Sequence, residues 1–193
     1  MISNLLRVKQ TPHVLKAGNI LISVPFMSDT YFYRTVVLLI EHNQSGSFGI
    51  VINKKLEKIP LKFVKTETQK KLNLYNGGPV EIDRLFFIHM YGDLLENNIS
   101  LPQGLFFGGK EYDLISLIKA DLVDEENIRF YIGYSGWESG QLETEIKAEM
   151  WVVGRFEKEY VFPENPQVWS HAVEALGKEY AHWLQFPEKA YYN

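Results

Sequence analysis

Residues 133–146, GYSGWESGQLETEI, constrain the fold of this chain more than any other segment does. The segment contains Gly133, Gly136 and Gly140, and glycine readily adopts backbone conformations that other residues resist. A strand-like run, residues 128–133, leads into the segment, and a helix-like pattern leads out of it. We therefore expect a sharply shaped crossing from sheet to helix, whose clustered aromatic and polar side chains form a surface patch.

The sequence supports two starts for the helix in this segment. Ser135 and Glu138 have the spacing of a capping box, whereas Ser139 could cap the helix instead and leave GYSGWE as a loop. Leu142 and Ile146 lie four residues apart, so both would face the core from one side of the helix.

The composition suits one compact domain spanning residues 1–193. With 46% hydrophobic residues, a chain of this length can bury about 70% of the surface that its unfolded form exposes. Cysteine is absent, which excludes disulfides, thiol nucleophiles and thiolate metal sites. The longest plainly apolar run, residues 36–40, is too short to cross a bilayer. We expect a cytoplasmic protein that makes no membrane contact.

The formal net charge of −4 counts against nonspecific nucleic-acid binding by the whole surface. Residues 54–71 differ from the rest, because they hold seven lysines and two glutamates, a local charge of +5. This pattern is typical of a solvated surface segment, which we expect to be partly helical after Pro60. One alternative is a face that docks an acidic partner, and a weaker one is nucleic-acid contact through these lysines. Direct nucleic-acid binding is not expected.

Alternation and apolar runs predict strands, and spacing of three and four residues predicts helices. The predicted strands are residues 20–24, 35–41, 47–52, 84–90, 128–133 and 150–154, with the second and third joined as a hairpin by the HNQSG turn. The predicted helices are a short turn capped by Ser28 and Asp29, residues 110–120, the helix carrying Leu142, a helix capped by Asn165 with Pro166 first and Gly177 at its end, and a shorter one through Trp183.

Five ordered blocks cover nearly the whole chain. They are GNILISVP, FYRTVVLLIEHNQSGSFGIVIN, YNGGPV followed by Arg84 and FFIH, GYSGWESGQLETEI with Trp151, and GKEYAHWLQFP. In this order they closely resemble the AlgH/YqgE family of small bacterial proteins, also called the UPF0301 or DUF179 family. The resemblance implies an α+β fold in a cytosolic protein, in which a bent, largely antiparallel sheet forms a partial barrel flanked by helices.

The resemblance also implies an association with transcriptional control of alginate synthesis, from which the family takes its name. This sequence has no helix-turn-helix pattern, so a regulatory role would be indirect. Members of the family often carry Ala where Ser135 stands, so a nucleophilic serine there would not be a family property. They often carry Pro where Ser139 stands, which favours a helix start near Ser139.

The glycine-rich segment is close to two known sequence motifs but matches neither. GYSGW is close to the nucleophile elbow GxSxG, but Trp137 occupies the position of the second glycine, so capping by Ser135 is the better interpretation. The glycine spacing is GxxGxxxG and not the dinucleotide-binding GxGxxG, and Glu138 would repel a phosphate. A small anion at the helix start remains an alternative to a purely structural turn.

Glu41 and His42 lie together at a strand end, where a carboxylate and an imidazole could act as acid and base near neutral pH. Neighbours in an extended strand point to opposite faces, however. We favour structural roles, in which Glu41 pairs with Arg34 or Arg84 and His42 bonds within the HNQSG turn. His89 follows an apolar strand pattern and is predicted to be a buried histidine bonded to a neighbour.

Metal and cofactor binding are not expected. The sequence contains no HxH, HExxH or calcium-loop spacing. His171 and His182 are eleven residues apart, which is about 16 Å along a continuous helix and too far for one ion.

The sequence therefore favours a noncatalytic binding or regulatory protein that recognises an unknown protein or small molecule, with no catalytic residue assigned. The predicted binding residues are Tyr134, Trp137, Gln141 and Glu143, with Arg34, Glu41, His42, Asn53 and Arg84 nearby. The warrant is a cluster of polar and aromatic residues that lacks a complete catalytic set. The alternative is a hydrolase or transferase that uses Glu41 or His42 as general base.

Overall fold

The computed structural model describes residues 14–27, 29–56, 73–163 and 166–187. The strands in these parts are β1 (Asn19–Ser23), β2 (Val36–Asn43), β3 (Gly46–Val51), β4 (Leu74–Asn76), β5 (Val80–His89), β6 (Ile99–Ser100), β7 (Phe106–Phe107), β8 (Ile128–Glu138) and β9 (Trp151–Arg155). The α-helices are α1 (Glu111–Lys119), α2 (Gln141–Lys147) and α3 (Val168–Leu176). Short 3₁₀ helices are η2 (Thr30–Phe32), η4 (Gly92–Leu94), η5 (Pro102–Gly104), η6 (Lys158–Tyr160) and η7 (Lys178–Gln185).

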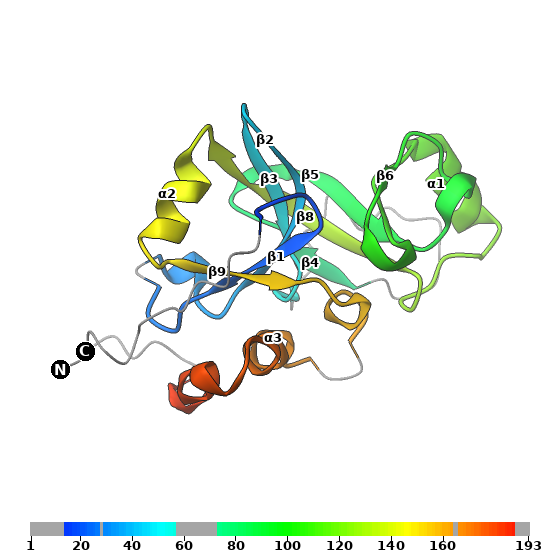
Figure 1. Ribbon diagram of the computed structural model, residues 1–193. Coiled ribbons are helices and arrows are strands. Elements are labelled where there is room, and N and C mark those ends of the chain that lie inside the picture. The colour runs from blue at the N-terminus through cyan, green and yellow to red at the C-terminus, as the bar shows by residue number, and fades with distance from the viewer. Residues whose placement is uncertain (1–13, 28, 57–72, 164–165, 188–193) are drawn as a thin grey trace.

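The nine strands form one bent sheet, in the order β6-β7-β5-β8-β3-β2-β1-β9, with β4 pairing with β8 beside this path. Of the described pairings only that of β4 with β8 is parallel. The sheet curves into a partial barrel that is not closed, and helices pack around it (Figure 1). The expected fold class, an α+β fold with a bent and largely antiparallel sheet, is confirmed.

The predicted hairpin of residues 35–41 and 47–52 is present as β2 and β3. Its turn is tighter than the HNQSG motif indicates, because β2 continues to Asn43 and β3 already begins at Gly46. The Asn43 side chain accepts a hydrogen bond from the Ser45 N–H at 2.7 Å, so it closes the turn as an Asx turn. The pairing shifts between Leu39 and Glu41, where the hairpin carries an irregularity.

Strand β8 corrects the expectation that the glycine-rich segment is a turn. It continues for eleven residues through Gly133 and Gly136 to Glu138. Its first part pairs with β4 and β5, and its last part pairs with β3. One strand therefore belongs to both halves of the sheet, and the chain enters α2 only after Glu138.

Neither expected cap begins the helix α2. Ser135 is a buried strand residue opposite Gly49, so its capping box with Glu138 does not form. Ser139 instead donates its hydroxyl to the Gln44 carbonyl at 2.7 Å, which ties the helix entry to the hairpin turn. The residue at the N-cap is Gly140, in the left-handed conformation. The predicted inward face is confirmed, because Leu142 and Ile146 are both buried.

The glycines of the NGGP segment (residues 76–79) and of the GYSGW segment (residues 133–137) meet where β8 bends. Gly133 has φ +68°, and a Cβ there would lie 2.4 Å from the Gly78 carbonyl oxygen. A Cβ on Gly77 would lie 2.3 Å from the Gly133 carbonyl oxygen. The Gly77 N–H donates to the Ile132 carbonyl at 2.7 Å, so the two backbones are in direct contact. Side chains are excluded here because the chain segments touch through their backbones.

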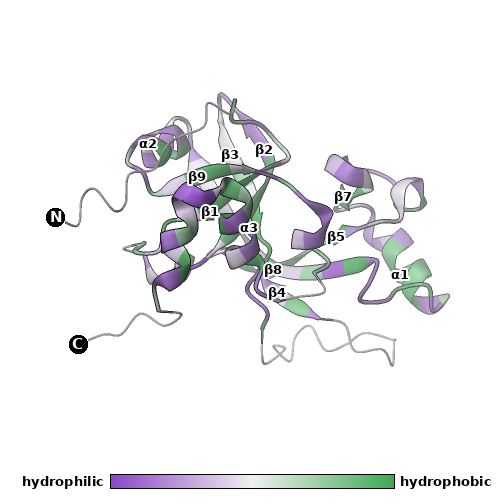
Figure 2. Ribbon diagram, turned by 60° about the horizontal axis from the view of Figure 1, so that its bottom comes forward, coloured by the Kyte–Doolittle hydropathy of each residue, from purple (hydrophilic) through white to green (hydrophobic). Residues whose placement is uncertain are grey.

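Helix α3 packs against one face of the sheet, below β1 and β9 in Figure 1. Trp169, Ala172 and Val173 on one side of the helix are buried, and Gly177 follows the last turn. The helix begins at Val168, so Pro166 precedes it, and Asn165 lies outside the described residues. In Figure 2 hydrophobic stretches occur along strands of the sheet, and the helices carry both hydrophobic and polar residues.

Three further expectations concern the helix of residues 110–120, the cap at Asp29 and the lysine-rich segment. Helix α1 confirms the prediction for residues 110–120, and Asp29 caps η2 by accepting the Tyr31 N–H at 2.8 Å. The lysine-rich segment lies mostly outside the described residues, including the predicted helix after Pro60. None of the described helices combines the length and the apolar composition that a bilayer crossing requires.

Gly133→Ala is expected to reduce the free energy of unfolding by at least about 3 kcal/mol, because it adds a clash to the cost of a left-handed backbone. Gly104→Ala is the matched control, since Gly104 has φ +74° and a Cβ added there would meet nothing within 4 Å. The control is expected to lose about 1 kcal/mol. Urea unfolding of the two variants tests this, and equal losses would contradict the proposed backbone contact.

Candidate functional site

Four of the predicted site residues come together at the tip of the β2–β3 hairpin, where α2 packs. They are His42, Trp137, Gln141 and Glu143. Ser47 connects them, because it pairs with His42 on one side and with Trp137 on the other. This arrangement follows from the antiparallel pairing of β2, β3 and β8, which brings three strand ends to the same edge. We call these four residues and Ser47 the hairpin–helix site.

His42 lies between a hydroxyl and a carboxylate in this site. Its Nδ1 is 2.8 Å from the Ser47 Oγ, and its Nε2 is 3.7 Å from the Glu143 Oε1. Ser47 is buried, the His42 side chain is 16% exposed, and that of Glu143 is 44% exposed. His42 thus bonds to Ser47, one residue beyond the HNQSG turn in which its bond was predicted. The Glu143 carboxylate remains accessible to a partner from solvent.

The Glu145 carboxylate holds the residues of the site together, and this role was not predicted from the sequence. Its Oε2 accepts hydrogen bonds from the indole N–H of Trp137 at 2.9 Å and of Trp151 at 2.8 Å. Its Oε1 accepts a bond from the Gln141 side-chain amide at 2.8 Å. One carboxylate therefore joins β8, β9 and α2. Two tryptophans that need acceptors when buried, and a glutamate four residues after Gln141, were the signals that could have revealed it.

The roles of Trp137 and Gln141 follow from these bonds. Trp137 is 7% exposed and its N–H is bonded, so it supports the surface from inside and does not present its ring to solvent. Gln141 is exposed, and its Oε1 accepts the Glu138 N–H at 3.0 Å. The side chain of Gln141 thereby accepts from a backbone N–H beside the start of α2. A small anion bound at this helix start was the alternative that the sequence left open.

Tyr134 does not join Trp137, although the two residues are close in sequence. They are separated by an odd number of strand positions, so their side chains emerge on opposite faces of β8. Tyr134 packs at 4.8 Å from the Phe48 ring and 5.9 Å from the Phe86 ring, in the core that α3 covers. Trp137 belongs to the core beneath α2.

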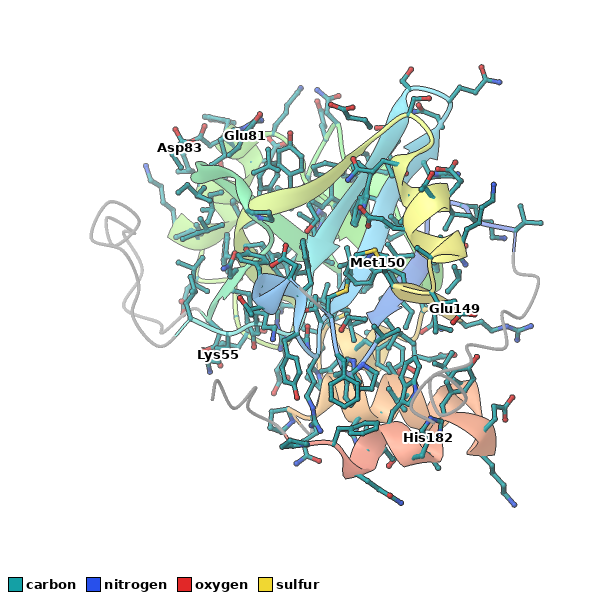
Figure 3. All side chains as sticks on the ribbon, turned by 90° about the vertical axis from the view of Figure 1, so that its left-hand side faces the viewer. Lys55, Glu81, Asp83, Glu149, Met150 and His182 are labelled. Carbon is teal, nitrogen blue, oxygen red and sulfur yellow. The ribbon has the colours of Figure 1, made fainter. Side chains whose placement is uncertain are left out.

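Glu41 was expected to pair with Arg34 or Arg84, but Glu41 and Arg84 both make other contacts. Glu41 is exposed and accepts a hydrogen bond from the Asn43 side-chain amide at 2.6 Å. Arg84 pairs with Glu81 at 2.6 Å on the exposed part of β5, where Figure 3 labels Glu81. The expected pairing of Glu41 with Arg84 fails because the two residues lie on strands that are not neighbours in the sheet.

Arg34 and Asn53 form a second polar centre at the opposite end of β2. Asn53 accepts the Val36 N–H at 3.0 Å and donates to the Arg34 carbonyl at 2.9 Å. Arg34 has φ +47°, and its guanidinium carbon lies 4.7 Å from the centre of a Trp169 ring. Arg34 and His42 are eight positions apart along an extended segment, a distance of about 26 Å at about 3.3 Å per residue. The nine predicted residues therefore do not form one site.

The second polar centre contains three further residues that were not assigned to it from the sequence. Lys54 is half-buried and donates to the Tyr33 carbonyl. Burial, with the nearby charge of Arg34, lowers the pKa of Lys54. The Tyr31 hydroxyl donates to the Asn76 side chain, and burial raises the pKa of Tyr31 to about 12. Lys54 is thus held inside the fold, which does not suit a lysine that contacts nucleic acid.

His89 is a buried histidine bonded to its neighbours, as predicted. Its Nε2 lies 2.8 Å from the Gly108 carbonyl oxygen, and its Nδ1 accepts the Tyr91 N–H at 3.2 Å. These partners fit a neutral ring with the proton on Nε2. Burial lowers the pKa of His89, although the Gly108 carbonyl offsets part of this effect. No group of three or more metal-binding side chains occurs in the described parts of the chain.

Comparison with known proteins agrees with this fold. A family model described as AlgH-like matches residues 20–181. A UPF0301 protein of Bacteroides thetaiotaomicron is 37% identical over 195 residues, covering 99% of this chain and 98% of that protein. A UPF0301 protein of Parabacteroides distasonis is 38% identical over 179 residues, covering 91% and 90% of the two chains. This chain belongs to the AlgH-like family.

Two solved structures share the fold of this AlgH-like chain. The solution structure of the AlgH protein from Pseudomonas aeruginosa has a TM-score of 0.69 and 30% identity, covering 88% of this chain and 93% of that one. The crystal structure of a protein from Corynebacterium diphtheriae has a TM-score of 0.75 and 20% identity, covering 90% and 94%. The second likeness supports the fold alone.

Glu145→Gln in this AlgH-like chain is expected to lower the free energy of unfolding by about 2–4 kcal/mol, because an amide cannot accept all three hydrogen bonds. Glu143→Gln, on the exposed side of α2, is expected to change it by less than about 0.5 kcal/mol. Urea unfolding followed by tryptophan fluorescence measures both. Similar small effects of the two substitutions would show that Glu145 does not anchor α2.

The free energy of unfolding is expected to fall as the pH decreases below about 6.5, the ordinary pKa of histidine. The unfolded chain binds a proton on residue 89 more readily than the folded chain does, because the folded pKa of His89 is lowered. His89→Gln should reduce this dependence. His182→Gln, at a position on η7 labelled in Figure 3, leaves His89 in place and should retain it. Unfolding curves between about pH 5 and 8 test the difference.

Proposed function

We propose that this protein is a noncatalytic binding protein that recognises a protein or small-molecule partner with its hairpin–helix site. The observation that carries the proposal is the triple hydrogen bond of Glu145, which holds α2 against two strands. Recognition surfaces gain affinity when rigid elements support them before the partner arrives. The exposed groups available to a partner are those of Glu143 and Gln141, with the edge of His42.

The catalytic alternative has less support from the geometry. Glu41 and His42 are neighbours in β2, and their side chains make separate contacts, with Asn43 and with Ser47. A general base must lie within hydrogen-bond reach of a group that it can deprotonate. Ser47 would be that group for His42, but it is buried between two strands. A binding role uses the same residues without requiring substrate to reach the Ser47 hydroxyl.

A regulatory role would be exerted through the bound partner, in the cytoplasm. The association of the AlgH/YqgE family with transcriptional control supports a regulatory part, which would be indirect because the sequence has no helix-turn-helix pattern. The formal net charge of −4 also disfavours a general affinity for DNA. The partner would then carry any contact with nucleic acid.

Glu143→Lys is expected to abolish capture of the native partner from extract of the producing bacterium, because it reverses the charge beside His42. Glu126→Lys is the matched control, since Glu126 is an exposed carboxylate on the loop before β8. Both variants should have the same melting temperature as the native protein. Affinity capture with quantitative mass spectrometry should find partners that bind the native protein and the control at least about tenfold more than Glu143→Lys.

Two results would contradict this proposal. Equal capture by Glu143→Lys and the native protein would place any partner contact elsewhere on the molecule. Turnover of a substrate by the native protein, lost in His42→Ala, would favour the catalytic alternative instead.

A further inference from the structure

A cluster of hydrogen-bond donors lies on the inner face of β8, away from the hairpin–helix site. Arg129 and Tyr131 are two residues apart on this strand, so their side chains emerge on the same face. Tyr75 on the neighbouring strand β4 is directly paired with Tyr131. All three residues are buried, at 7%, 0% and 8% exposure respectively. We call them the inner donor cluster.

The side chains of this cluster are stacked closely together. The guanidinium carbon of Arg129 lies 4.4 Å from the centre of the Tyr75 ring and 5.5 Å from that of Phe162. The rings of Tyr75 and Tyr131 are 5.7 Å apart. Arg129 is therefore held between two aromatic rings, an arrangement that fixes the plane of its five N–H donors.

The charge of Arg129 has no carboxylate partner within the described parts of the chain. Glu125 is the acidic residue whose charge is felt at Tyr75, but it is exposed and forms no ion pair with Arg129. A buried cation is normally paired or hydrogen-bonded, because removal from water is costly. The stacked rings satisfy the face of the guanidinium and leave its N–H edge without an acceptor among the described residues.

The Tyr131 hydroxyl is a buried group without a hydrogen-bond partner among the described residues. Burial raises the pKa of Tyr131 and of Tyr75, although the positive charge of Arg129 offsets part of this effect for both. Both hydroxyls therefore stay protonated at neutral pH and can donate. The inner donor cluster offers a positive charge and phenolic donors, but no anion of its own.

We infer that the inner donor cluster binds an oxyanion, the carboxylate or phosphate group of a small ligand, between Arg129 and the Tyr131 hydroxyl. Such a group accepts two parallel bonds from a guanidinium and has further lone pairs for a phenol. This binding satisfies both groups at once, which no described residue does. The site is independent of the proposed partner surface, because Tyr131 and Trp137 belong to different cores.

Thermal unfolding with sodium phosphate or sodium acetate, at constant ionic strength set with sodium chloride, tests this inference. The melting temperature of the native protein should rise with one or both anions and should saturate, as binding to the folded state requires. Stabilisation by phosphate alone would identify a phosphate site, and stabilisation by acetate alone a carboxylate site. Absence of an anion-specific rise in the native protein would overturn the inference.

Three variants separate specific binding from a general effect of the salt. Arg129→Gln should weaken the apparent affinity about tenfold or more, and Arg155→Gln, at an exposed arginine on β9, should leave it unchanged. Tyr131→Phe should also weaken the affinity while keeping or raising the melting temperature in chloride, because it removes an unsatisfied hydroxyl. This variant decides the matter if Arg129→Gln does not fold. An equal response of Tyr131→Phe and the native protein would contradict the site.

Discussion

The backbone contact of Gly133 with Gly77 and Gly78 allows β8 to pair with both halves of the sheet. A strand that bends sharply normally loses pairing, because side chains at the bend collide with the neighbouring chain. Here three glycines remove those side chains, and the Gly77 N–H bonds directly to the Ile132 carbonyl. The bend positions everything that follows: Arg129 and Tyr131 lie before it, and Trp137 lies after it. Tyr131 belongs to the core that α3 covers, whereas Trp137 belongs to the core beneath α2.

Glu145 provides a second constraint, and it is electrostatic as well as geometric. A carboxylate that accepts two indole N–H groups and one amide remains stabilised although it is partly withdrawn from water. The same bonds give an acceptor to the indole N–H groups of Trp137 and Trp151, which would otherwise be buried without one. Helix α2 has only seven residues and would be marginal alone. Its stability therefore comes from this anchor and from the burial of Leu142 and Ile146.

Local patterns were sufficient to predict most elements and the family, but not the partners of each strand. Residues 35–41 and 47–52 were identified as a hairpin because a turn motif separates two apolar runs. The glycines of residues 133–140 indicated a turn, since a glycine that serves a close backbone approach looks the same in sequence as one that serves a turn. Arg34 and His42 were grouped although an extended β2 separates them. Arg129 was missed because its stacking partners come from β4 and from the loop after η6.

The two candidate binding regions lie in separate cores, and this limits how they could communicate. Coupling between sites requires an element with two arrangements that both sites can bias. Strand β8 is the covalent connection between the inner donor cluster and the hairpin–helix site, but it is hydrogen-bonded on both sides along much of its length. Its bend at Gly133 lies against the backbone of Gly78, and the Gly77 N–H bonds to the Ile132 carbonyl beside it. Because these bonds hold β8 in one arrangement, the two regions are expected to act independently.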